Sequence, residues 1–190
     1  SSIKKDHEEA VNYYERAQNI FEENGYKKQI PYSLQNLASA QLSLGKFESA
    51  INNYDKLVLI MEELGYGQER IRGNLRNKAY AMSIMGDYEG ASKIYENNLE
   101  FYEELDDKEG IFHLLRSLGI SNYLNQNHKR TLEYFERANE LSKEIEFPGY
   151  ELSTELYLNL CYKYFDQKID LKRIQDILKE TEDAGYTTNF

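Results

Sequence analysis

Apolar residues recur every three or four positions along almost the whole chain, which is the period of an amphipathic α-helix. Proline, which interrupts helices, occurs only at Pro31 and Pro148. No stretch has the strict apolar–polar alternation of a half-buried strand. The pattern predicts about nine helices, with ends accurate to a few residues. They cover residues 4–24, 28–44, 47–64, 69–85, 88–105, 108–125, 128–146, 149–166 and 170–184. We therefore expect an all-α protein.

The helical pattern itself repeats after about 40 residues. Four alternating helices carry, near their start, a small residue that an aromatic residue follows four positions later. These pairs are Ala10 and Tyr14, Ala50 and Tyr54, Ala91 and Tyr95, and Thr131 and Phe135. We call these helices B-type and the intervening ones A-type; the latter carry leucine and a small residue, as at Leu37 and Ala38. Gly45 and Gly86 stand where an A-type helix needs a left-handed C-cap, and Gln126 takes that place in the third repeat.

Each repeat is thus a hairpin of one A-type and one B-type helix. Such hairpins bury their apolar faces only against their neighbours, so the series predicts an α-solenoid. We expect residues 1–190 to form a single array. It comprises an unpaired B-type helix at 4–24 and hairpins at 28–64, 69–105, 108–146 and 149–184. The last helix has a polar outer side, as a terminal cap requires, whereas helix 4–24 lacks its A-type partner. We therefore expect further repeats or another domain before residue 1, or self-association through this open helix.

The formal net charge of −10 disfavours direct binding of nucleic acids and docking on anionic membranes. Cys161 is the single cysteine, so no internal disulfide can form, which is compatible with a reducing compartment. No segment resembles a signal peptide or is apolar over the length of a bilayer. We expect a cytoplasmic protein.

The sequence contains no recognisable arrangement of catalytic residues. His7, His113 and His128 fall in different repeats, without carboxylates or cysteine at metal-ligand spacing. Nucleotide-binding glycine motifs and hydrolase motifs are absent. Cys161 takes the small-residue position of an A-type helix and is expected to be a buried packing group. We predict no enzyme activity, no cofactor and no metal site.

The order of leucine, small residue, glycine, aromatic residue and alanine resembles the tetratricopeptide repeat, most closely in LQNLASAQLSLGKFESAINNY at residues 34–54. The long period resembles the variant of peptide-sensing bacterial regulators of the Rap, PlcR and NprR type. It also resembles that of adaptors such as kinesin light chain and the Pins/LGN group. Departures are Lys78 in place of leucine, Asn98 in place of a small residue and Gln126 in place of glycine. The resemblance implies a right-handed superhelix with A-type helices lining its concave groove.

The resemblance also implies which residues face the groove. The position two before the small A-type residue is occupied by Asn36, Asn77, Ser117 and Asn159. An asparagine amide both donates and accepts, so a row of them could hold a peptide backbone. Alternatively these side chains could cap or pack locally. One position earlier, Arg76 and Arg116 could clamp a carboxylate or phosphate, or could pair with nearby acidic residues.

Aromatic residues near these positions predict a mixed wall along the groove. They are Tyr32, Tyr80, Tyr123, Tyr162 and His113. Tyrosine suits binding surfaces because it buries a large area and keeps a polar tip, although packing between repeats is an equally good explanation for each one. The sequence therefore predicts a protein- or peptide-binding module that holds an extended segment in its groove. The alternatives are the sensor domain of a peptide-responsive regulator and an enzyme regulatory or assembly subunit that uses the convex face.

Overall fold

The structure is a computed structural model that describes residues 2–145, 148–165, 172, 176–177 and 179–180. These residues contain eight α-helices and no strand, which confirms the predicted all-α fold. The helices are α1 (Ser2–Glu23), α2 (Ile30–Ser43), α3 (Phe47–Glu63), α4 (Gln68–Ile84), α5 (Tyr88–Glu104), α6 (Lys108–Leu124), α7 (His128–Ser142) and α8 (Pro148–Tyr164). The predicted ninth helix, 170–184, lies mostly outside the described residues.

Short turns end the helices where the sequence predicts them. Gly45 and Gly86 have φ angles of 74° and 90°, in the left-handed region that glycine tolerates best. Gln126 adopts the same conformation with φ 58°, although it carries a side chain. The next residue, Asn127, caps α7 because its side chain accepts a hydrogen bond from the backbone N–H of Arg130. The third repeat therefore replaces the glycine turn with a left-handed glutamine and a side-chain cap.

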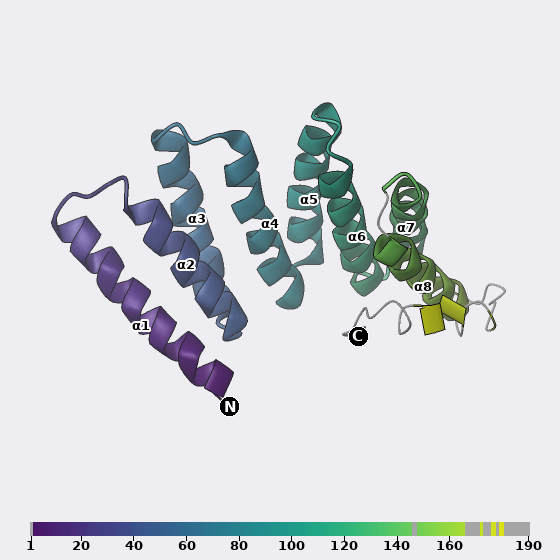
Figure 1. Ribbon diagram of the computed structural model, residues 1–190, viewed down its shortest axis with the longest axis horizontal. Coiled ribbons are helices and arrows are strands. Elements are labelled where there is room, and N and C mark those ends of the chain that lie inside the picture. Colours follow the sequence, from purple (N-terminus) through teal and green to yellow (C-terminus); the bar gives the residue numbers. More distant parts are fainter. Residues whose placement is uncertain (1, 146–147, 166–171, 173–175, 178, 181–190) are drawn as a thin grey trace. The chain divides into compact units, whose positions relative to one another are not determined.

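The chain divides into two compact units, Ser1–Ile94 (unit 1) and Tyr95–Phe190 (unit 2), with the division inside α5. In unit 1, α1 packs on α2, α2 on α3 and α3 on α4, and successive helices run antiparallel (Figure 1). Ala38 and Ala50 are completely buried, so α2 and α3 can approach closely. Leu34, Leu57 and Met61 fill the space around them. The repeat positions identified from the sequence are thus the core of this unit.

In unit 2, α6 packs on α7 and α7 on α8. Leu115, Leu118 and Phe135 are buried in this core. Gly119 provides the room for Phe135, because a Cβ at this glycine would lie only 2.7 Å from the aromatic ring. None of the helices in the described part of the chain is long and apolar enough to cross a membrane.

Candidate functional site

The four expected groove positions differ in what their side chains contact. The Asn77 side chain hydrogen-bonds the hydroxyl of Tyr54. Ser117 and Asn159 donate instead to carbonyls one turn earlier in their own helices, those of His113 (2.9 Å) and Glu155 (2.8 Å). Asn36 makes no hydrogen bond to any residue that the structure describes. Local bonding therefore engages three of the four side chains and leaves the amide of Asn36 available.

Tyr54 is the polar centre of unit 1. Its ring is completely buried, and its hydroxyl lies 3.2 Å from Ser39 Oγ besides bonding Asn77. Burial raises the pKa of the Tyr54 phenol above its ordinary value, and the two hydrogen bonds offset part of this shift. Tyr54 belongs to α3, Ser39 to α2 and Asn77 to α4, so this network ties three successive helices together.

Two depressions flank Asn36. One, of about 340 Å³, lies between α1 and α2 and includes Tyr13 and Tyr32 in its lining. The other, of about 100 Å³, is polar and is lined by Tyr32, Gln35, Asn36 and Arg70, so α2 and α4 both contribute to it. Tyr32 is 68% exposed at the border of the two. The surface around Asn36 thus combines an unbonded amide, an exposed aromatic ring and a cation.

Further along α4, Arg76 and Tyr80 are exposed. Arg76 forms no ion pair with a described residue, whereas the neighbouring Lys78 pairs with Asp55. Arg70 lies over the ring of Tyr66, 4.9 Å from its centroid, and remains exposed. The positive charges of Arg70 and Arg76 on α4 are therefore both open to solvent.

Unit 2 places most of its expected site residues in internal contacts. His113 Nε2 lies 3.2 Å from the Tyr150 hydroxyl, and the Tyr162 hydroxyl donates to Glu136 at 3.0 Å. Burial, followed by the hydrogen bond to Glu136 and the charge of that carboxylate, raises the pKa of Tyr162. The guanidinium carbon of Arg116 lies 5.9 Å from the centre of the Tyr157 ring, and its Nε is buried without a hydrogen-bond partner among the described residues.

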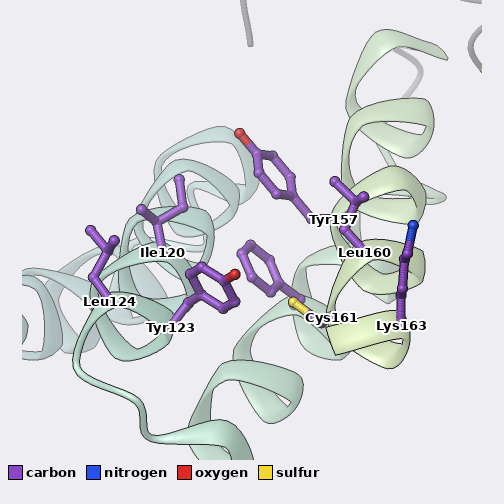
Figure 2. A pocket seen from close by; sticks show the side chains of 8 residues that line it. Ile120, Tyr123, Leu124, Tyr157, Leu160, Cys161 and Lys163 are labelled. Carbon is purple, nitrogen blue, oxygen red and sulfur yellow. The ribbon is translucent and has the colours of Figure 1, made fainter. Parts of the chain in front are cut away.

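A pocket of about 520 Å³ opens in unit 2 between α6, α7 and α8 (Figure 2). Its lining residues are Ile120, Tyr123, Leu124, Phe135, Tyr157, Leu160, Cys161 and Lys163. Phe135 stacks on Tyr157 with centroids 5.1 Å apart and ring planes at 2°. The sequence interpretation included only Tyr123 of this set among its site residues. Apart from the exposed Lys163, the others have the apolar spacing of core residues, so the pattern alone could not distinguish them from packing.

The structure shows no arrangement for nucleophilic or metal chemistry at these positions. Cys161 is buried in the pocket wall, and burial raises the pKa of its thiol to about 11, which keeps it protonated at neutral pH. Across the described residues, no group of three or more histidine, cysteine or acidic side chains is placed to hold a metal ion. The candidate site residues instead provide aromatic rings, amides and cations, which are groups suited to binding.

Comparison with known proteins agrees with this fold. Residues 2–63 match the tetratricopeptide repeat family, and no curated protein sequence matches the chain. A Podosopora anserina protein described as a kinesin light chain with nearly identical tetratricopeptide-like repeats has a similar structure, with a TM-score of 0.76 and 16% identity. The match covers 93% of this chain and 85% of that one.

Two further similar structures belong to longer chains, of which this chain matches only a part. The apo form of RapI gives a TM-score of 0.76 at 13% identity over 97% of this chain and 51% of RapI. Bacillus thuringiensis PlcR, solved with the peptide PapR7 and DNA, gives 0.68 at 17% identity over 95% of this chain and 69% of PlcR. The chain therefore has the fold of a tetratricopeptide-repeat protein, and its residues 2–63 match the sequence model of the tetratricopeptide repeat family.

Proposed function

We propose that the chain binds an extended segment of a partner protein, or a free peptide, on the exposed side chains of α2 and α4. The observation that carries this proposal is the unbonded amide of Asn36 beside the exposed Tyr32 and Arg70. Mid-helix asparagine is intrinsically unfavourable, and here it gains no bond within the described chain in return. A ligand backbone would supply the missing donor and acceptor.

Other exposed side chains of α2 and α4 suit the same ligand. Tyr32 and Tyr80 offer large rings with polar tips, which are frequent anchors at protein interfaces. Arg76 carries a positive charge without an ion pair to a described residue and would attract acidic groups of the ligand. In a chain of net charge −10, such local cations determine which ligands approach this surface.

Other expected site residues could also contact the ligand. An asparagine has two donors and a carbonyl with two acceptor sites, so Asn77 and Asn159 keep capacity for a ligand beyond their internal bonds. Arg116 would serve acidic groups of a ligand at unit 2. A peptide complex of the same fold, PlcR with PapR7, supports a peptide as the ligand class.

The proposal can be tested by affinity capture with wild type and with Asn36→Ala/Arg76→Ala, followed by quantitative mass spectrometry. Captured segments are then synthesised and titrated by calorimetry. Each lost charge-assisted or backbone hydrogen bond should cost about 1–3 kcal/mol of binding free energy, so the double variant should bind at least tenfold more weakly. Its thermal stability should stay close to that of wild type, because neither side chain has a partner in the described fold.

A matched control is Asn52→Ala/Lys56→Ala on α3. It removes the same kinds of group from exposed positions of a B-type helix. This control should bind the segment as tightly as wild type. Equal affinities for wild type and for Asn36→Ala/Arg76→Ala would exclude the α2–α4 surface and favour the B-type side of the chain.

A further inference from the structure

The same repeat position is built differently in the two units. In unit 1, Ser39 of α2 and Asn77 of α4 hydrogen-bond the hydroxyl of Tyr54 from α3. In unit 2, the corresponding residues of the repeat are Ile120 of α6, Asn159 of α8 and Phe135 of α7. Asn159 has no phenol to bond there and donates to the carbonyl of Glu155. In unit 2, apolar side chains thus replace the serine and the tyrosine of this network, and only its asparagine is kept.

Two of these unit 2 residues, Ile120 and Phe135, line the pocket of that unit. Its volume of about 520 Å³ is more than ten times that of a water molecule, and it lies in the range of small-ligand sites. Leu124 and Leu160 stand at the same pocket and are 45% and 43% exposed. Apolar surface of this kind gains free energy when a ligand covers it.

The charges near the pocket define the ligand further. Lys163, in the last turn of α8, is the one charged residue among the described residues of the lining (Figure 2). It is exposed and makes no ion pair with a described residue. The guanidinium of Arg116 lies near the ring of Tyr157, another lining residue, and its Nε has no hydrogen-bond partner among the described residues. Among the described residues, no carboxylate belongs to the lining. An apolar group with a neighbouring negative charge therefore complements this place.

The geometry points to a pocket that receives one bulky apolar side chain of a bound peptide, with an acidic residue of the same peptide next to Lys163. The inference rests on the proposed peptide binding and adds a specificity to it. The α2–α4 surface offers hydrogen bonds to a peptide backbone, whereas this pocket of unit 2 selects a side chain.

The test uses fluorescein-labelled glycine–serine peptides that carry one phenylalanine between two glutamates. Matched peptides replace the phenylalanine with serine or both glutamates with glutamine. Anisotropy titrations should show that wild type prefers the phenylalanine peptide over the serine peptide by about ten- to hundredfold, as burial of a large apolar side chain predicts. Replacing the glutamates should weaken binding by about two- to fivefold, the effect of an exposed charge pair.

The sharpest variant is Ile120→Ser/Phe135→Tyr, which gives unit 2 the serine and phenol of unit 1. Asn159 then stands where Asn77 bonds the phenol in unit 1. This variant should lose the preference for phenylalanine, and its circular dichroism spectrum should match that of wild type. Leu160→Gln alters only an exposed side chain of the pocket and should reduce the preference, whereas the control Leu59→Gln, at an exposed leucine of α3, should retain it.

Three results would overturn the inference. If wild type binds the phenylalanine and serine peptides equally, the pocket selects no side chain, although binding at α2 and α4 can still hold. If none of the peptides binds, the pocket inference is wrong, and the captured segment alone decides the proposed function. If light scattering shows a dimer that Ile120→Ser/Phe135→Tyr dissociates, the occupant is a second copy of the chain.

Discussion

Gly119 offers a sharp test of the packing in unit 2, because alanine at this position should destabilise the chain although alanine favours helices. An added Cβ would lie 2.7, 2.8 and 2.9 Å from three carbons of the Phe135 ring. Phe135 is 1% exposed and stacks on Tyr157. The ring can therefore yield only by breaking the stack or by moving into the neighbouring pocket.

The expected magnitude follows from two opposing terms. Forcing extra volume into a packed core costs about 1–3 kcal/mol, and replacing glycine by alanine inside a helix returns about 1 kcal/mol. Gly119→Ala should thus lower the free energy of unfolding by about 1 kcal/mol. Gly73 in the interior of α4 has no atom within 4 Å of an added Cβ, so Gly73→Ala should raise the free energy of unfolding by about 0.5–1 kcal/mol.

The assay is urea unfolding followed by far-ultraviolet circular dichroism, with native-state hydrogen exchange to report α4 and α6 separately. The two variants should shift the unfolding midpoint in opposite directions. If Gly119→Ala stabilises the chain as much as Gly73→Ala, the close approach of α6 to Phe135 is wrong. The position of Phe135 in the lining of the unit 2 pocket would then be wrong as well.

Three further changes test other parts of the structure. Tyr54→Phe removes the hydroxyl shared by Ser39 and Asn77 and should lower the free energy of unfolding by about 1–2 kcal/mol in urea titrations, whereas an unchanged value would mean that the network contributes nothing. Burial and Glu96 raise the pKa of Tyr134 from 10.0 to about 12. The unfolded chain therefore loses this proton first, so stability should fall as pH rises between these values, and the fall should be smaller in Tyr134→Phe. Asn127→Ala removes the cap of α7 and should cost about 1 kcal/mol, with faster hydrogen exchange at the start of that helix as the local signature.

The fold could be predicted because its determinants are local and recur with the repeat. Apolar period, small residues such as Ala38 and Ala50, and the turn glycines Gly45 and Gly86 each act over a few residues, and the structure places them as expected. Gln126 marks the limit of this predictability. The sequence shows that the third repeat lacks the turn glycine, but only the structure shows that Gln126 still adopts the left-handed conformation.

The candidate site was less predictable, because side chains at equivalent positions of different repeats have different hydrogen-bond partners. Asn77 and Asn159 share one repeat position, yet the first bonds a phenol of another helix and the second its own backbone. The cause lies on a third helix, where Tyr54 has the hydroxyl that Phe135 lacks. The pocket could not be predicted from the sequence for a related reason. Tyr157 and Leu160 have the spacing of core residues, and exposure of an apolar side chain is a property of tertiary packing.

Packing between successive helices, seen from α1 to α4 and from α6 to α8, has a consequence for biosynthesis. Each of these helices finds a main packing partner in a helix that immediately precedes or follows it in the chain. A ribosome releases helices in the same order, so a new helix can dock on the one already made without waiting for distant sequence. Contacts of such short sequence separation also form quickly, on the microsecond-to-millisecond scale of helical proteins. Assembly of each unit can therefore keep pace with translation.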